Sequence, residues 1–342
     1  MIKALFAVLI MLVGLAACGP KSPDPEASLS NPAQDFATKA ACKPVPDGPV
    51  RIEGGSFVMG SDAVYPDQEG PLRETSVSGF WIDPHEVTNR QFGEFVQATE
   101  FVTVAEMPVD PAVFGVPRDQ IPADLLEPGS GVFSPPDRPS RNYSDWWTYI
   151  PGANWKKPYG PQGPDARPDQ PVVHLAFDDM QAYAAWKQGR LPTEAEWEFA
   201  ASAGAAKYTD QPEPDAANTW QGVFPVDNQM SDGFKGIAPV GCFQPNAYGL
   251  YDMVGNVWEV TADFYRPGHD PQERSDPRGP SENSAYDPMN PGPPTRVMKG
   301  GSYLCAPNYC QRYRPESRQG RDPGLGASNV GFRLVYDKPP RN

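Results

Sequence analysis

The sequence predicts an α+β fold with low regular secondary structure, in which short strands and a few helices are joined by much ordered coil. Pro and Gly account for 43 and 32 of the 342 residues, so many connections must be irregular. Short apolar stretches that alternate with polar residues indicate strands, and three helix starts carry capping signals. Tryptophan and tyrosine are interleaved with the prolines, which indicates packed rather than disordered chain.

The chain begins with a predicted lipoprotein signal peptide, residues 1–17. Lys3 precedes an apolar run that ends in "LAAC", and this run is shorter than the roughly 20 residues needed to cross a bilayer. "LAAC" resembles the lipobox of bacterial lipoproteins, with Cys18 as the lipidated residue, although an ordinary cleaved signal would also fit. The expected location is therefore periplasmic and lipid-anchored to a bacterial membrane, and Gly19 after the cysteine favours the outer membrane. Residues 18–50 are rich in Pro, Ser and Asp and are predicted to be a tether.

The remaining residues, 51–338, are predicted to form one domain. "PVRIEGGSFVMGS" alternates apolar and polar residues and predicts a strand that enters a turn. "SVSGFWIDPHEVTNRQFGEFVQAT" predicts a second strand and then a helix, because Thr88 with Gln91 three residues later is a capping box. Phe92, Phe95 and Val96 fall on one face of that helix and are expected in the core.

The amino-acid composition changes twice along the middle of the domain. Residues 103–170 are so rich in Pro and Gly that neither long helices nor paired strands are expected there. Two helices follow, one starting at Asp178 with Gln181 as its partner and one starting at Thr193 with Glu196. Trp197 and two alanines, Ala200 and Ala201, form the inward face of the second. Beyond residue 204 only short strands and turns are expected.

Charge and histidine content exclude some functions. The formal net charge of -14 makes nucleic acid an unsuitable partner. Only three histidines are present, His85, His174 and His269, and their spacing is not that of metal ligands, which argues against a metal site built from a histidine triad.

Four cysteines remain after Cys18: Cys42, Cys242, Cys305 and Cys310. In an oxidising compartment they permit three disulfide connectivities, and Cys42 and Cys242 either pair with each other or stay free. Cys305 and Cys310, with four residues between them in "LCAPNYC", could close a disulfide, bind a metal or carry redox chemistry. Spacing alone does not decide between these roles.

Several segments together resemble one family. "GGSFVMGS", "HEVTNRQF", "RLPTEAEWEFAA", "YGLYDMVGNVWEVTADF", "KGGSYLCAPNYCQRYRPESR" and "SNVGFRLV" occur in the order typical of the formylglycine-generating enzyme, or sulfatase-modifying factor, family. The resemblance covers residues 51–335. It implies the formylglycine-generating-enzyme fold, distantly related to C-type lectins, and an oxidoreductase that converts a sulfatase cysteine to Cα-formylglycine.

The resemblance also implies a catalytic site and its cofactor. Cys305 and Cys310 would bind Cu(I), which is consistent with the preference of soft thiolates for that ion, and O2 would be the co-substrate. The partner would be a sulfatase polypeptide containing Cys-x-Pro-x-Arg. The other residues that match the family's active-site cleft are Ser302, Tyr309, Arg318, Asn329 and Trp258.

The resemblance to the family also implies two structural Ca2+ sites. The first comprises Asn218 and Asp232 with the carbonyls of Thr219 and Phe234, and the second comprises Asp252 and Glu259 with the carbonyls of Gly255 and Val257. Oxygen ligands from both side chains and backbone are typical of Ca2+, although acidic residues in such turns also serve as caps.

The chain departs from part of the family pattern. Pro315 and Leu334 stand where some eukaryotic relatives have structural cysteines, so packing and calcium are expected to stabilise the fold instead. The alternative function is a non-catalytic, membrane-tethered, lectin-like scaffold or binding lipoprotein of the cell envelope. The presence of both Cys305 and Cys310 favours the enzyme, because a scaffold does not need them.

Overall fold

The computed structural model describes residues 42, 45–136, 138, 140, 142–203 and 216–339. The predicted signal peptide, Cys18 and most of the predicted tether lie outside these residues. No helix in the described part of the chain is both long and apolar enough to cross a membrane.

Helices are few and short. The α-helices are α1 (Pro66–Glu69), α2 (Asn89–Thr99), α3 (Phe177–Trp186) and α4 (Glu194–Ala201). The 3-10 helices are Val104–Glu106, Pro111–Phe114, Arg118–Gln120, Ala123–Leu126, Tyr143–Trp146 and Glu282–Ser284. Low helix content and abundant coil confirm the predicted fold class.

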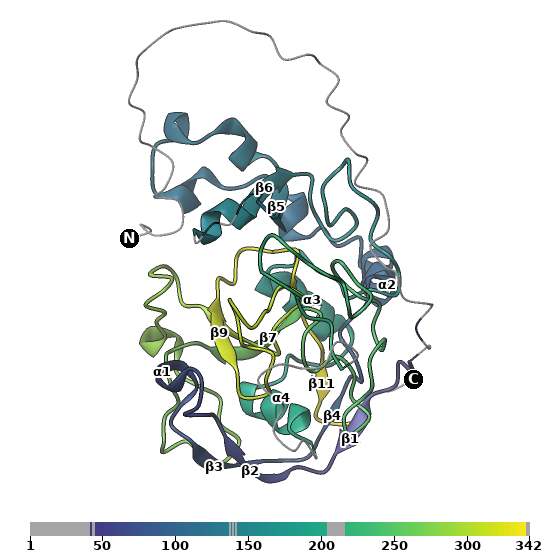
Figure 1. Cartoon of the computed structure of the whole chain (residues 1–342), viewed down its shortest axis with the longest axis vertical. Helices are drawn as coiled ribbons and strands as arrows, with labels where there is room; N and C mark the ends of the chain where they lie inside the picture. Colours follow the sequence, from purple (N-terminus) through teal and green to yellow (C-terminus); the bar gives the residue numbers. More distant parts are fainter. Residues whose placement is uncertain are drawn as a thin grey trace, which may run out of the picture.

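The strands of the described residues form four small sheets. They are β1 (Val50–Ile52), β2 (Gly55–Met59), β3 (Arg73–Val77), β4 (Phe80–Ile82), β5 (Gly129–Phe133), β6 (Trp147–Pro151), β7 (Trp258–Phe264), β8 (Arg296–Lys299), β9 (Arg318–Arg321), β10 (Val330–Gly331) and β11 (Val335–Tyr336). The central sheet has the order β10-β7-β8-β9, a second sheet has the order β1-β4-β11, and β2-β3 and β5-β6 are separate antiparallel pairs. Figure 1 shows the central sheet between the β5-β6 pair at one end of the molecule and α4 with β1 to β4 at the other.

Local capping chemistry sets the helix starts. Thr88 caps α2 and Thr193 caps α4, each in a reciprocal capping box with the residue three positions later, as predicted. The predicted start of α3 at Asp178 is wrong. Its N-cap is Ala176, whose backbone N–H donates to the Asp179 carboxylate at 2.8 Å, so an acidic residue inside the first turn replaces the expected capping side chain.

The predicted apolar faces are buried. Phe92 and Phe95 of α2 belong to the main core cluster with Tyr183 of α3, and Val96 packs against that cluster. Trp197, Ala200 and Ala201 of α4 lie in a second cluster with strands β1 to β4. The two cysteines of the "LCAPNYC" segment are members of the main cluster, so the core extends to the edge of the predicted active site.

The described residues of the region 103–170 are mostly irregular, with one departure from expectation. β5 and β6 pair antiparallel over five residues each, from Gly129 opposite Pro151 to Phe133 opposite Trp147, although no paired strands are expected from the sequence. Gly129 allows the close approach of the two strands, since a Cβ there would lie 2.5 Å from the Ile150 carbonyl oxygen. Trp146 and Trp155 are buried, as the aromatic content of the region indicates.

Cys42 and Cys242 form a disulfide, which resolves the alternative left open by the sequence. It joins the end of the predicted tether to the segment that carries the predicted calcium ligands. Both cysteines pack against a small apolar cluster formed by Phe234, Ala238 and Phe243.

Candidate active site

The cysteine pair lies in the long turn that connects β8 to β9, residues 300–317. Gly301 begins this turn with a φ of +75°, and a Cβ there would lie 2.8 Å from the Arg312 carbonyl oxygen, so only glycine allows the two ends of the turn to approach. Within the turn the Cys305 N–H donates to the Ser302 carbonyl at 2.8 Å, and the Cys310 N–H donates to the Ala306 carbonyl at 3.0 Å. These two tight bends bring the cysteines together.

The two sulfur atoms are 2.7 Å apart, and both cysteines are free thiols. This is longer than the roughly 2.05 Å of a disulfide bond, so the two cysteines are adjacent and not joined covalently in the structure. The side chains are buried, at 1% exposure for Cys305 and 6% for Cys310. A hydrogen bond from Cys305, together with nearby positive charge, lowers the pKa of Cys310 to about 7, whereas burial raises the pKa of Cys305 well above its ordinary value. Cys310 is therefore the more acidic thiol of the pair.

Three of the other predicted site residues are linked around the cysteines. The Asn329 side-chain amide donates to Ser302 Oγ at 3.1 Å, and the Ser302 N–H donates to Cys305 Sγ at 3.4 Å. The Trp258 N–H donates to the Asn329 carbonyl at 2.9 Å, and Trp258 lies in the same core cluster as both cysteines. Ser302 and Asn329 thus attach the turn to the central sheet, at the position directly before β10.

Tyr309 forms the exposed face of the site. Its ring stacks on Phe224 with centroids 4.4 Å apart and meets Trp146 edge-on at 4.8 Å, while 46% of the residue remains exposed. Phe224 also stacks on Phe133. The aromatic wall Phe133, Trp146, Phe224 and Tyr309 is not predicted by the sequence, because its members come from separate segments and no local pattern links them.

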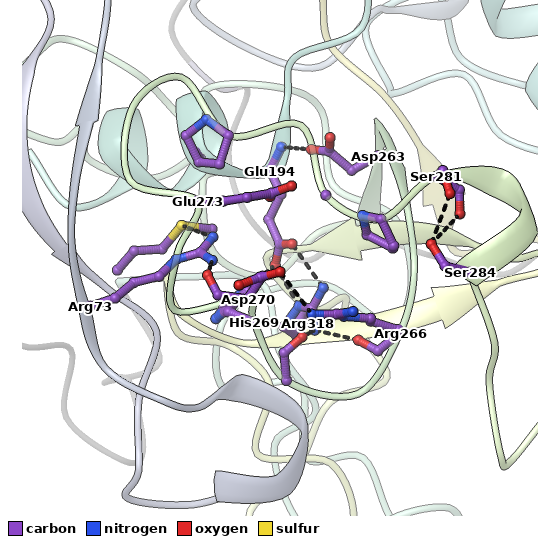
Figure 2. A pocket seen from close by; sticks show the side chains of 16 residues that line it. Arg73, Glu194, Asp263, Arg266, His269, Asp270, Glu273, Ser281, Ser284 and Arg318 are labelled. Carbon is purple, nitrogen blue, oxygen red and sulfur yellow. Dashed lines mark hydrogen bonds and ion pairs between the residues drawn. The ribbon is translucent and has the colours of Figure 1, made fainter.

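Arg318, the remaining predicted cleft residue, lies in a different environment. Its guanidinium forms a two-point ion pair with the buried Glu194 at 2.6 and 2.9 Å and donates to three carbonyls, including that of Gln68. It lines a polar cavity of about 160 Å³ between α4, β3 and the loop that follows β7, where Figure 2 shows it facing Glu194. Arg318 therefore binds a buried carboxylate and backbone carbonyls.

The residues of the first predicted calcium site lie in one turn-rich region. The Asp232 carboxylate accepts hydrogen bonds from the Thr219 N–H at 3.2 Å and the Phe234 N–H at 2.9 Å, so three of the four predicted residues are already connected. The Asn218 side chain donates to the Gly236 carbonyl and to Asn256. These bonds hold the Asp232 carboxylate and the Asn218 amide in fixed positions.

The second predicted calcium site is adjacent to the first. Asn218 forms a β-bridge with Gly255, so the two ligand segments run side by side. Asp252 is buried and accepts from the Gly241 N–H at 2.6 Å, and burial raises its pKa to about 6. Both oxygens of Glu259 bind the Arg333 guanidinium at 2.6 Å, which leaves less of that carboxylate for a metal ion than expected.

Glu86 is a further carboxylate in this region that the sequence analysis misses. It is fully buried, one oxygen accepts from the Asn256 amide at 3.1 Å, and its Oε2 has no hydrogen-bond partner among the described residues. Burial, and then the charges of Asp252 and Glu259, raise the pKa of Glu86 well above its ordinary value. An acidic residue directly before a capped helix gives no sequence signal for this role.

No three His, Cys, Asp or Glu side chains of the described residues converge on one point with metal-binding geometry. A calcium ion would need backbone carbonyl oxygens as well as carboxylates, which is the ligand set that the resemblance implies.

Comparisons with known proteins show which family the chain resembles. The family model of the sulfatase-modifying factor enzyme 1-like domain matches residues 34–338. A formylglycine-generating enzyme from Mycobacterium tuberculosis is 45% identical over 84% of this chain and 97% of its own length, and that from Bos taurus is 39% identical over 96% and 87%. Among solved structures, PvdO from Pseudomonas aeruginosa superposes with a TM-score of 0.60 at 24% identity over 85% of this chain and 94% of that one, a likeness of fold alone.

Proposed function

The chain belongs to the sulfatase-modifying factor family of formylglycine-generating enzymes, and on that premise we propose that it activates sulfatases by a copper- and O2-dependent reaction. The reaction converts the active-site cysteine of a sulfatase, within a Cys-x-Pro-x-Arg motif, to Cα-formylglycine. The enzymatic class follows from the family, whereas copper, O2 and the motif are part of the proposal.

The observation that carries the proposal is the free, buried cysteine pair with sulfurs 2.7 Å apart. Two thiolates so close to each other match the preference of Cu(I) for few, soft ligands. When bound, Cu(I) would supply the one-electron chemistry with O2 that ordinary side chains lack.

The surrounding residues would prepare the pair for this role. The Ser302 N–H fixes Cys305 Sγ, and Asn329 in turn fixes Ser302, so the first sulfur is held from a rigid strand. Burial excludes water from both sulfurs. The exposed ring of Tyr309, supported by Phe224 and Trp146, would bound the peptide next to Cys310.

We further propose that calcium occupies the two predicted sites and stabilises the fold. The unpaired Oε2 of Glu86 and the raised pKa values of Glu86 and Asp252 support this proposal, because buried carboxylates without a neutralising cation retain their protons. The ion would be held by Asp252 and Glu259 with the Gly255 and Val257 carbonyls, and a second ion by Asn218 and Asp232 with the Thr219 and Phe234 carbonyls.

The location of the enzyme is also a proposal. Lipidation at Cys18 would place it on the periplasmic face of a membrane, since several acyl chains at one N-terminus anchor a protein stably. Cell fractionation tests this directly. The Cys18→Ala protein should move to the soluble periplasmic fraction, and unchanged membrane association would contradict lipid anchoring.

The catalytic proposal is tested with a synthetic peptide that contains Cys-x-Pro-x-Arg. The purified protein is stripped of metal and then supplied with Cu(I), with Zn2+ or with no metal, in air and under argon. Mass spectrometry should detect loss of the thiol and gain of an aldehyde only with copper in air. Equal conversion in the metal-free or argon sample would contradict the proposed cofactor or oxidant.

A further inference from the structure

The chain around Phe224 is attached to the cysteine turn at two points. At the first, the Trp220 N–H donates to the Cys305 carbonyl at 2.9 Å. At the second, the Asn308 side chain accepts a hydrogen bond from the Phe224 N–H at 3.3 Å and donates to the Phe224 carbonyl at 3.0 Å. The segment 220–224 therefore runs beside the turn that carries both cysteines.

Asn308 lies in the tight bend between the two cysteines. The Tyr309 N–H and the Cys310 N–H both donate to the Ala306 carbonyl, at 3.1 and 3.0 Å, so backbone hydrogen bonds already form this bend. The two hydrogen bonds of the Asn308 side chain go instead to Phe224, 84 residues earlier in the chain. Because Asn308 is an exposed residue, water can replace these bonds, and their loss should cost little stability.

The bonds from Asn308 fix the backbone from which the Phe224 ring extends. That ring lies flat against the ring of Tyr309, with the two planes 9° apart and the centroids 4.4 Å apart. Asn308 and Tyr309 are consecutive residues, so the same short stretch of the turn binds Phe224 through its backbone and through its ring. Phe224 is 5% exposed, whereas Tyr309 is half-exposed, so Phe224 is the buried support for a ring that faces solvent.

We infer that Asn308 is a positioning residue for the peptide substrate, which acts through Phe224 on the ring of Tyr309. The inference rests on the proposed function, in which that ring bounds the peptide next to Cys310. Asn308 keeps Phe224 against the Tyr309 ring, and the supported ring presents one fixed face to the peptide. A ring that is held in advance loses little freedom when the peptide binds, so the affinity for the peptide is higher.

Other roles for Asn308 predict different results. If its hydrogen bonds only join two loops, their loss lowers the unfolding temperature and leaves the reaction of each folded molecule unchanged. If they hold the cysteines, their loss weakens Cu(I) binding. Positioning of Tyr309 instead changes the affinity for the peptide and KM, and it leaves Cu(I) affinity and kcat near their wild-type values, because backbone hydrogen bonds form the bends that bring the sulfurs together.

The test compares Asn308→Ala with wild type in two measurements. Under argon, where the proposed oxidation does not proceed, the dissociation constant of a fluorescent Cys-x-Pro-x-Arg peptide is measured with Cu(I)-loaded protein. In air, KM and kcat for the same peptide are measured per folded molecule. Asn308→Ala should raise the dissociation constant and KM by about 3- to 10-fold, the size expected when an aromatic contact is lost, with kcat and Cu(I) affinity unchanged.

A second variant shows whether the effect passes through Phe224. Phe224→Leu removes the ring but keeps the backbone that Asn308 binds, and it should raise the dissociation constant of the peptide by a similar factor. The double variant should bind the peptide no more weakly than the weaker single variant, because both changes remove the same contact.

Asn246→Ala is the matched control. The Asn246 side chain also donates to a backbone carbonyl, that of Ala200 at 2.8 Å, and accepts from the backbone N–H groups of Tyr248 and Leu250. Ala200 and Leu250 belong to the second core cluster, whereas both cysteines belong to the main one. Asn246→Ala should therefore lower the unfolding temperature and leave the affinity for the peptide unchanged.

The outcomes separate this inference from the proposed function. Wild-type protein that neither binds nor oxidises the peptide would overturn both. If the wild type binds the peptide without oxidising it, the proposed function fails while the comparison under argon still tests Asn308. Wild-type peptide affinity in Asn308→Ala would overturn only the inference, as would an equal loss in Asn246→Ala, a fall in Cu(I) affinity, or fully additive effects with Phe224→Leu. If Asn308→Ala does not fold, Phe224→Leu decides, and wild-type peptide affinity in that variant would overturn the inference.

Discussion

The guanidinium of Arg333 binds both carboxylate oxygens of Glu259 at 2.6 Å, with both side chains almost completely buried. The same carboxylate accepts a hydrogen bond from the Trp197 indole at 2.8 Å, and Arg333 donates to the carbonyls of Asp83 and Tyr251. The pair therefore joins β7, α4 and the C-terminal segment at one point. A buried charge at this junction has no access to water if its partner is removed.

We predict that, in calcium-free buffer with EDTA, Arg333→Leu destabilises the protein by about 3 to 5 kcal/mol, because it leaves Glu259 buried without its counter-charge. Urea unfolding measures the change. Arg51→Gln is the matched control, since Arg51 pairs with the exposed Glu53 at 3.5 Å and its loss should cost less than about 1 kcal/mol. Equal costs for the two variants would contradict the importance of the buried pair.

Calcium is predicted to raise the unfolding temperature. A ligand that binds only the folded state at 100 times its dissociation constant stabilises it by about 2.7 kcal/mol. Asp232→Asn and Asp252→Asn should each lose part of this gain. In EDTA, Asp252→Asn should not be destabilised, because burial raises the pKa of Asp252 to about 6 and the neutral amide replaces a carboxyl that ionises with difficulty. An unfolding temperature that is identical in EDTA and in excess calcium would contradict both sites.

A third prediction concerns pH. Burial raises the pKa of Asp263 from its ordinary 3.8 to about 7. Between these values the folded state retains a proton that the unfolded state releases, so this group lowers stability as pH rises from about 4 to 7, with a slope of at most about 1.4 kcal/mol per pH unit. Asp263→Asn should therefore gain stability relative to wild type between pH 5 and pH 7.5. The amide oxygen can still accept the hydrogen bond from the Glu194 N–H that Asp263 accepts, which Figure 2 shows.

Urea unfolding of both proteins at these two pH values checks the prediction. A difference in stability that is the same at pH 5 and pH 7.5 would show that the pKa of Asp263 is not raised in the folded state.

Local chemistry was the part of this fold that could be predicted from the sequence. The capping boxes at Thr88 and Thr193 each use residues three positions apart, so they are visible before folding. The start of α3 was predicted two residues late, because a carboxylate inside the helix can bind the N-cap backbone without any capping side chain at the N-cap. The β5-β6 pairing was missed because Gly-rich strands pair through backbone contacts that carry little side-chain signal.

In the candidate site, too, local features could be predicted from the sequence and long-range contacts could not. The close approach of Cys305 and Cys310 was predicted because they share one short segment. The stacking of Tyr309 on Phe224 and the contact of Arg312 with Gln68 join segments 85 and 244 residues apart, and no pattern in the sequence connects them. Arg318 was expected to line the cleft, yet its charge is directed to Glu194, a partner that only the folded chain identifies.

The central claim, that the cysteine pair is the catalytic unit, is tested most directly by peptide oxidation in Cys305→Ser, in Cys310→Ser and in the double variant. Rates are normalised to folded protein, and Cu(I) binding is measured in the same samples. We predict that both single variants lose nearly all copper affinity and turnover, and that the double variant is scarcely worse, because groups that act as one unit are strongly non-additive. Wild-type turnover per folded molecule in either single variant would contradict the account.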